Sequence, residues 1–273
     1  LDENSAKTSY NKMFFAYLKT FERLGLKAIP MAADTGPIGG DLSHEFIILA
    51  DTGESKIYAD KKIFEISLKK FEFNKSSLES MRKEFSSFYA VTDEKFTKKD
   101  FDEKVSKNNQ IITTGIEVGH IFYFGDKYSK PLNCLIDSKE GKKTSIKMGS
   151  YGIGVSRLVG AIIEAKYLNN VMKWPEAISP FEVVIIPSIS KNNTENLKKA
   201  ENVYNYLKKQ NVDALLDDVE ENMSAKFKKH DLLGIPYQII IGSKSSEDKF
   251  EFKEIGKESQ ILKLDQIKDK LKK

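Results

Sequence analysis

The chain opens with apolar residues at helical spacing. Positions 9–24 repeat apolar side chains every three or four residues, at Met13, Phe14, Tyr17, Leu18, Phe21 and Leu24. This spacing predicts a helix that Gly25 ends. Residues 27–34 (KAIPMAAD) predict a short extended segment, and a glycine-rich turn at 36–40 leads to a strand at 45–50. The helix is therefore followed by strands joined by turns.

Later strands are predicted where apolar runs return. One covers 116–124, and another covers 143–148 and enters a glycine-rich turn. Strands joined by such turns favour an antiparallel sheet. Residues 56–110 are rich in Lys and Glu with scattered aromatic residues, and they fit a strand and one or two short helices.

The pattern changes after Trp174, where Pro175 and Pro180 interrupt a helix. Apolar runs then alternate with amphipathic segments, which predicts strands at 181–186, 212–216 and 237–241, helices at 194–210 and 224–233, and finally two short strands and a helix. This alternation is typical of an α/β layer with a mixed, mostly parallel sheet. We predict an α+β domain with an antiparallel sheet at 1–175 and an α/β domain at 176–273.

Composition narrows the class of protein. The 273 residues are 40% apolar, and the net charge of +4 is mild for a protein that binds nucleic acid. No apolar run has the length of a membrane span, and no basic-then-apolar signal segment opens the chain. The single Cys134 excludes an intramolecular disulfide, and no Cys/His cluster has zinc spacing, so we predict no metal ligands. A reducing cytoplasm and no membrane partner fit best.

One segment places a positively charged side chain where a helix disfavours it. In residues 147–165 (KMGSYGIGVSRLVGAIIEA), three glycines precede Arg157, which falls in the first turn of the predicted helix. A cation there is disfavoured by the helix dipole by up to roughly 1 kcal/mol, and a bound polyphosphate would reverse that sign. Only three of the 44 basic residues are arginines. The G-x-x-G-x-G order matches neither the P-loop nor the dinucleotide fingerprint. A plain strand, turn and helix with a surface arginine is the alternative.

Four segments together resemble a known family. MGSYGIGVSRLVGAIIE resembles motif 3 of the class II aminoacyl-tRNA synthetases, in the form carried by bacterial-type prolyl-tRNA synthetases. ADTGPIGGDLSHEF, GIEVGHIFYFGDKYS and LLDDVEENMSAKFKKHDLLGIP resemble the same family in the same order. The resemblance covers most of the chain outside 56–110.

The resemblance assigns residues to ATP. It implies that Arg157 holds the γ-phosphate and has a catalytic role, that Gly152 and Gly154 floor the adenylate site, and that Gly149 also binds ATP. ATP and Mg²⁺ are the implied cofactors.

The resemblance also assigns residues to proline. It implies that His120 faces proline and its adenylate as a second catalytic residue, and that His44 and Glu45 line the amino-acid pocket. Glu117, three residues before His120, would face the other way on a regular strand and is a weaker candidate for proline binding. Ser150 stands where related enzymes often have Cys, and we expect it only to shape the pocket. Hydrogen-bonded core histidines are the alternative for His44 and His120.

The C-terminal part resembles the anticodon-binding domain of the prolyl, threonyl, glycyl and histidyl enzymes. On that resemblance, Asp217, Asp218, Lys226 and Phe227 contact the tRNA anticodon. Acceptors, a cation and an aromatic ring suit base recognition in single-stranded RNA. A solvated turn is the alternative, and the segment lacks the arginines and glycine of the family pattern after its paired aspartates. We expect His230 to be exposed.

Two departures limit the expected activity. Residues 56–110 are too short for the editing domain that many bacterial enzymes insert there, so we expect no hydrolysis of mischarged alanyl-tRNA. On the resemblance, the chain begins at Leu1, just after motif 2, and lacks motif 1, motif 2 and a Thr-x-Glu proline loop. Loss of the motif 2 cation would remove roughly 3–4 kcal/mol of transition-state stabilisation. This chain alone is expected to be nearly inactive.

The function that the resemblance implies is ligation of proline to tRNA(Pro) through prolyl-adenylate, as the C-terminal portion of a prolyl-tRNA synthetase. A homodimer is expected for the complete enzyme. Two alternatives stay open: a synthetase of the same subclass for another amino acid, and a non-catalytic relative that binds tRNA or regulates.

Overall fold

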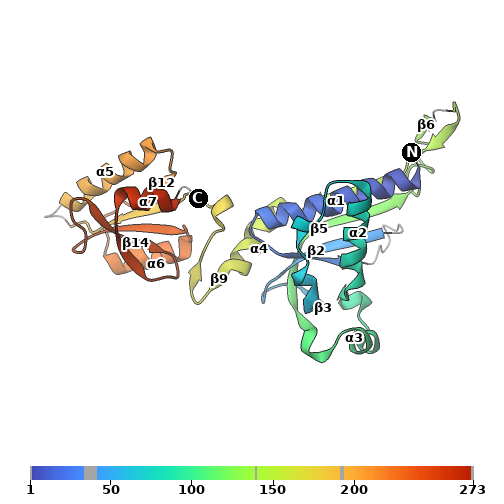
Figure 1. Cartoon of the computed structure of the whole chain (residues 1–273), viewed down its shortest axis with the longest axis horizontal. Coiled ribbons are helices and arrows are strands. Elements are labelled where there is room, and N and C mark those ends of the chain that lie inside the picture. Colours follow the sequence, from blue (N-terminus) through green and yellow to red (C-terminus); the bar gives the residue numbers. More distant parts are fainter. Residues whose placement is uncertain (1, 34–41, 139, 191–193, 272–273) are drawn as a thin grey trace. The chain divides into compact units, whose positions relative to one another are not determined.

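Two compact units make up the chain, residues 1–165 and 166–273 (Figure 1). The computed structural model describes residues 2–33, 42–138, 140–190 and 194–271. The glycine turn expected at 36–40 lies outside the described residues. The division between the units comes before the domain limit expected at 175/176, because a short hairpin at 167–172 belongs with the second unit. Among the helices formed by the described residues, none combines the length and the apolar character of a membrane span.

In its described residues, the first unit combines β-strands with four helices. The helices are α1 (Glu3–Arg23), α2 (Lys75–Ser87), α3 (Lys98–Lys104) and α4 (Val155–Lys166). The strands are β1 (Ala28–Ala32), β2 (Leu42–Leu49), β3 (Ser55–Asp60), β4 (Ala90–Thr92), β5 (Gln110–Gly125), β6 (Leu135–Asp137), β7 (Lys143–Ser145) and β8 (Met148–Ile153). Short 3-10 turns are η2 (Lys61–Glu65), η3 (Leu68–Lys70), η4 (Asp93–Lys95) and η5 (Lys107–Asn109).

Helix α1 forms where the apolar spacing predicts it, and it is longer at its start. Asp2 caps the helix by accepting a hydrogen bond from the Ser5 backbone N–H, which satisfies one of the free donors of the first turn. The helix ends at Arg23, and Gly25 adopts φ 70°, a left-handed conformation that glycine reaches without strain. The predicted helix and its stop are confirmed.

Strand β5 is the centre of the larger sheet. The sheet has six antiparallel strands in the order β1-β2-β5-β3-β4, with β8 paired to β5 as well. The first part of β5 pairs with β3, and its second part lies between β2 and β8. The predicted antiparallel sheet is confirmed, and residues 56–110 supply strands and short helices as expected. The β6–β7 hairpin forms a separate two-stranded sheet.

The expected glycine turn before α4 is wrong. The strand predicted at 143–148 is two strands, β7 and β8, and Gly149 and Gly152 lie inside β8 rather than in a turn. The physical reason is pairing: the free edge of β5 offers backbone donors and acceptors to residues 148–153, and glycine does not prevent ladder hydrogen bonds.

The second unit is an α/β layer. Its strands are β9 (Tyr167–Leu168), β10 (Val171–Met172), β11 (Val183–Pro187), β12 (Ala214–Leu216), β13 (Tyr237–Ile241), β14 (Lys249–Glu254) and β15 (Ser259–Lys263). Its helices are α5 (Glu195–Lys209), α6 (Met223–Leu233) and α7 (Leu264–Leu271), with a 3-10 turn η6 (Glu176–Ile178). The main sheet has the order β12-β11-β13-β14-β15. Strands β12, β11 and β13 run parallel, and β14 and β15 pair antiparallel, so the predicted mixed sheet is confirmed.

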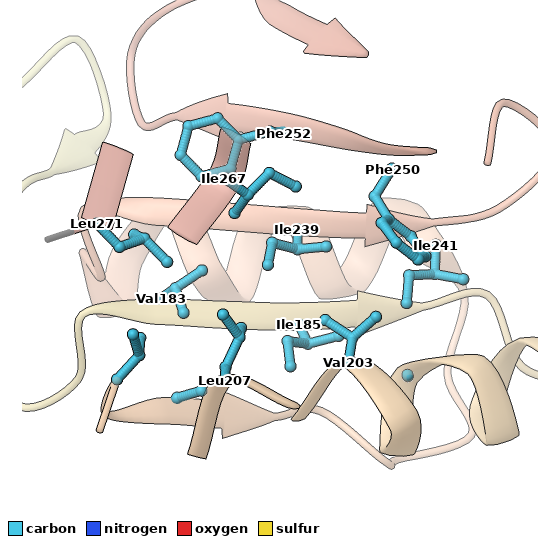
Figure 2. Close-up of a cluster of buried hydrophobic side chains, with 13 residues drawn as sticks. Val183, Ile185, Val203, Leu207, Ile239, Ile241, Phe250, Phe252, Ile267 and Leu271 are labelled. Carbon is cyan, nitrogen blue, oxygen red and sulfur yellow. The ribbon is translucent and has the colours of Figure 1, made fainter. Parts of the chain in front are cut away.

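Each face of this sheet carries its own core. On one face, alternate residues of β11 and β13, including Val183, Ile185 and Ile239, meet apolar residues of α5 and α7 (Figure 2). On the other face, Val184 and Ile186 pack with residues of α6. Burial on both faces explains why these strands are continuous apolar runs in the sequence.

Candidate functional site

The register of three strands collects polar residues on one face of the larger sheet. Residues that pair directly across strands point to the same face, so each row of partners shares one side. The rows are Glu45–His120–Gly152 and Ser43–Phe122–Ser150, each running across β2, β5 and β8. We call the side that carries these six residues the site face. Sequence reasoning expected four of them near the ligand, and Ser43 and Phe122 were missed.

His44 lies on the opposite face, against α1. Its Nδ1 atom is 2.6 Å from the Tyr10 hydroxyl, and its ring meets Phe14 edge to face at 5.0 Å. Burial lowers the pKa of His44 to about 3, so the ring is neutral and accepts from Tyr10. The expectation that His44 lines the amino-acid pocket is wrong, because neighbours on a strand alternate faces and Glu45 takes the site face. His44 is a core histidine.

Glu117 lies on the site face, against expectation. On a regular strand it would point away from His120, but the pairing of β5 with β2 shifts between Phe46 and Ile47. Phe46 is opposite Gly119 and Ile47 is opposite Glu117, so Val118 is an extra residue. A bulge of this kind puts residues that are three apart on one side. The Glu117 Oε1 atom is consequently 3.2 Å from Nδ1 of His120.

His120 connects the site face. Its Nε2 atom is 2.6 Å from the Ser43 hydroxyl, and its Nδ1 atom is 3.2 Å from Glu117 and 3.9 Å from Glu45. A ring that donates from Nδ1 to Glu117 and accepts at Nε2 from Ser43 satisfies these contacts. The ring also stacks on Phe122 at 3.8 Å. His120 is therefore held from three sides, with one fifth of its side chain exposed.

Two carboxylates share this small space. Burial, and secondly the charge of Glu117, raise the pKa of Glu45, while His120 acts in the opposite direction. Like charges in a partly buried site favour binding of a cation, because a cation relieves their repulsion. This arrangement suits an ammonium group or a metal ion.

Arg157 is in the first turn of α4, as predicted. Its Nη1 atom donates to the Glu117 backbone carbonyl at 3.1 Å and lies 3.9 Å from the Glu117 carboxylate, yet half of the side chain is exposed. The contact holds the guanidinium beside the site face without burying it. Its other N–H groups remain able to grip an oxyanion in a bidentate way.

The three glycines have different surroundings. A Cβ atom on Gly152 would meet none of the atoms that the structure describes within 4 Å beyond its chain neighbours, so the site face is open above it. On Gly154 it would be 3.2 Å from the Arg157 Cβ, which makes this glycine a spacer for the arginine. Gly149 pairs with Tyr123 and lies on the other face, where a Cβ would be 2.7 Å from the Tyr151 hydroxyl. Its expected role in ATP binding is wrong, because the alternation of the strand turns this position away from the site face.

Three site-face side chains could hold a metal ion. One ligand atom each of Glu45, Glu117 and His120 lies within 4.8 Å of the others. The sequence spacing did not predict these metal ligands, because two of them come from one bulged strand and the third comes from the neighbouring strand. Two carboxylates and an imidazole suit a divalent cation.

The second unit buries two of the four residues expected at the anticodon. Asp217 is 4% exposed and Lys226 is fully buried. The Lys226 ammonium donates to the backbone carbonyls of Pro187 at 3.1 Å and Asp217 at 3.0 Å. A buried ammonium cannot reach RNA, so the expectation of direct contact is wrong for Lys226, and Asp217 is equally enclosed. Asp218 is exposed, and Phe227 is half-buried against the Val184 core.

His230 is buried, not exposed. It is 1% exposed, and its Nε2 atom donates to Asp217 at 2.7 Å. The expectation failed because α6 turns this residue toward the sheet, where the Asp217 carboxylate offsets the cost of burying a polar ring.

Alternation could have identified Ser43 and Phe122, since each is two residues from a predicted site residue on its own strand. The bulge that brings in Glu117 has no signal in the sequence.

Both units have counterparts in known proteins. A family model described as an anticodon binding domain matches residues 182–273. The proline--tRNA ligase of Pelagibacter ubique is 58% identical over 98% of this chain and 61% of its own length. The proline--tRNA ligase of Bartonella quintana is 49% identical over 93% of this chain and 58% of its own length. The chain thus spans about three fifths of the length of the curated relatives it matches.

A solved structure matches the fold. The crystal structure of the Cryptosporidium parvum prolyl-tRNA synthetase, complexed with L-proline and AMP, covers 98% of this chain with a TM-score of 0.64 and 15% identity. The chain covers 44% of that protein.

Proposed function

Because this chain belongs to the prolyl-tRNA synthetase family, we propose that it forms the part of such an enzyme that completes the adenylate site and binds the tRNA anticodon. The reaction joins proline to tRNA(Pro) in two steps. The observation that carries the proposal is the half-exposed Arg157 beside the Glu117 carboxylate, which lies together with Glu45 and His120 on the face that is open at Gly152.

In the first step, a carboxylate oxygen of proline attacks the α-phosphorus of ATP. The bond to the bridging oxygen breaks, and pyrophosphate leaves with the electron pair. Arg157 binds the phosphate end and stabilises charge there, and Gly152 lets the nucleotide approach the backbone. The helix dipole of α4 is favourable for the same anion. The site contributes positioning and charge rather than a covalent nucleophile.

The carboxylates of Glu45 and Glu117 suit the secondary ammonium of proline. They lie on the same face as His120, which holds Glu117 in place through Nδ1. Phe122, stacked on His120, offers apolar surface next to these charges. An ammonium beside an apolar ring is the pattern that free proline presents. Ser150, exposed at the next position of the same face, shapes the pocket edge.

The residues also fit Mg²⁺, which neutralises phosphate charge when it is bound. Mg²⁺ prefers oxygen ligands, and the Glu117 carboxylate, 3.9 Å from the Arg157 guanidinium, would supply them, while Glu45 stays with the proline ammonium. His120 is the less suitable ligand of the three.

In the second step, the 3′-hydroxyl of the terminal adenosine of tRNA attacks the prolyl carbonyl carbon, and AMP leaves. The second unit holds the anticodon of the same tRNA, supported by the match of residues 182–273 to an anticodon binding domain. We place the enzyme in the cytoplasm as a homodimer, in keeping with the family.

The test is ATP–pyrophosphate exchange by the full-length protein with each amino acid in turn. We expect exchange with proline alone, followed by transfer of proline to tRNA(Pro). Exchange with a different amino acid would overturn the substrate assignment. Binding of tRNA without exchange for any amino acid would overturn the catalytic one.

A further inference from the structure

The strongest unassigned feature is a buried polar cluster in the second unit. Asp217, directly after β12, contacts three basic side chains of α6. His230 Nε2 is 2.7 Å from its Oδ2 atom, Lys229 Nζ is 3.0 Å from the same atom, and Lys226 Nζ is 3.6 Å from Oδ1. Asp217, Lys226 and His230 are each at most 4% exposed. We call these three residues the Asp217 cluster.

The Asp217 cluster joins three elements. The Lys226 ammonium donates to the carbonyl of Pro187, the last residue of β11, as well as to the Asp217 carbonyl just after β12. The Asp217 backbone N–H donates to Ile185 of β11 at 3.0 Å. The carboxyl ends of two parallel strands and one face of α6 are therefore fixed to a single point.

The loop that leaves this point is the exposed segment 218–222. Its start is held by the Val219 N–H, which donates to Asp217 Oδ1 at 3.3 Å. Its end is held by Lys229, which contacts Glu221 at 3.2 Å while it also contacts Asp217. Between these anchors the segment is exposed, and Val219 has 53% of its surface exposed.

A buried cluster of charges such as this one contributes little net stability compared with apolar residues at the same positions. Replacing a buried ion pair with apolar residues is often neutral or stabilising, whereas removing one partner leaves an uncompensated charge. Burial lowers the pKa of Lys226 and of His230, so both are partly disfavoured as cations, and Asp217 opposes this in each case. What the cluster gives in return is a defined position for the loop.

We propose that Asp217, Lys226 and His230 are positioning residues for anticodon binding: they touch no RNA, and they hold loop 218–222 in the shape that contacts unpaired bases. This inference rests on the proposed function. The contacts to RNA then come from exposed groups of the loop, such as Asp218, whose carboxylate can accept hydrogen bonds from base edges.

The test uses Lys226→Met in the full-length protein, which keeps the length of the side chain and removes the charge. The expected result is at least a tenfold rise in KM for tRNA(Pro) in aminoacylation. Proline-dependent ATP–pyrophosphate exchange should stay unchanged, because that step does not involve the anticodon. The matched control is Lys209→Met, an exposed lysine at the end of α5, which should leave both measurements unchanged.

Folding is followed by thermal melting of the same samples. Within the 273 residues the single tryptophan is Trp174, whose Nε1 donates to the Leu233 carbonyl at the end of α6, so its fluorescence reports on this helix. If Lys226→Met does not fold, Asp217→Asn decides, because it keeps the shape of the side chain and one oxygen that can accept from the Val219 N–H, while it removes the charge and the acceptor for His230 and Lys229. The deciding variant, folded and with a KM for tRNA within twofold of the parent, would overturn the inference. A parent protein with no proline-dependent exchange would instead overturn the proposed function.

Discussion

A methyl group added at position 152 tests whether the surface above this glycine is a ligand floor. Gly152 lies inside β8, opposite His120, and its φ angle is not positive, so alanine can adopt the same backbone conformation. An added Cβ would meet no described atom within 4 Å apart from its chain neighbours. Gly152→Ala therefore brings no clash and no backbone strain in the unliganded protein.

The size of both effects follows from this geometry. Replacing glycine at a compatible position stabilises by about 0.4–1 kcal/mol, because the unfolded chain loses freedom. That corresponds to a melting temperature higher by about 1–4 °C. A nucleotide lying on the floor must move by about 1 Å to clear the methyl group, and a displacement of that order can lower the rate on the order of 100-fold. The variant should be more stable and much less active.

The assay is proline-dependent ATP–pyrophosphate exchange by the full-length protein, with thermal melting of the same samples. Gly119→Ala is the matched control, because Gly119 lies on the next strand but faces α1, where a Cβ would be 3.1 Å from Tyr17 Cε1. The control should lose stability by about 1–3 kcal/mol through overpacking. Unchanged exchange in Gly152→Ala, or a loss of stability in that variant, would refute the assignment of the floor.

Two further predictions concern buried histidines. His44→Leu should lower the free energy of unfolding by about 1–3 kcal/mol in denaturant, because the buried Tyr10 hydroxyl loses its hydrogen-bond partner. The KM for proline should stay within twofold of the parent. A large rise in this KM would show that His44 contributes to the proline pocket after all. Burial lowers the pKa of His230 from its usual 6.5. Below pH 6.5 the unfolded chain therefore binds a proton at this position that the folded chain does not. The free energy of unfolding consequently decreases as the pH is lowered, by at most about 1.4 kcal/mol per pH unit. Glutamine does not titrate, so His230→Gln should reduce the dependence of stability on pH in thermal melts between pH 7.5 and 5.5, followed by Trp174 fluorescence. An equal pH dependence of stability in the variant and the parent would exclude His230 as its source.

The sequence predicts the elements well because their apolar periods are strong. Helix α1 and strand β13 (Tyr237–Ile241) are where the pattern puts them, and the change from an antiparallel to a mixed sheet follows from the order of elements. The glycines of β8 show the limit. Local propensity favours a turn there, but the free edge of β5 supplies pairing partners that no local pattern can reveal.

The site was predicted less completely, for two physical reasons. Strand alternation alone separates His44 from Glu45, and a regular strand would also separate Glu117 from His120, yet the bulge at Val118 brings the second pair together. A bulge depends on pairing between distant segments and has no local signal. Likewise, the burial of Lys226 depends on the Pro187 carbonyl, a partner that is distant in sequence.

The central claim is that Arg157 meets the phosphates of ATP beside the site face. Its most direct test is the KM for ATP and the rate of proline-dependent exchange in Arg157→Met and Arg157→Lys, compared with the parent full-length protein. Removing one preorganised group that stabilises transition-state charge typically costs 100-fold or more. We predict a loss of at least that size for Arg157→Met and a partial one for Arg157→Lys, with an unchanged melting temperature. Exchange by Arg157→Met within a few fold of the parent would contradict the account.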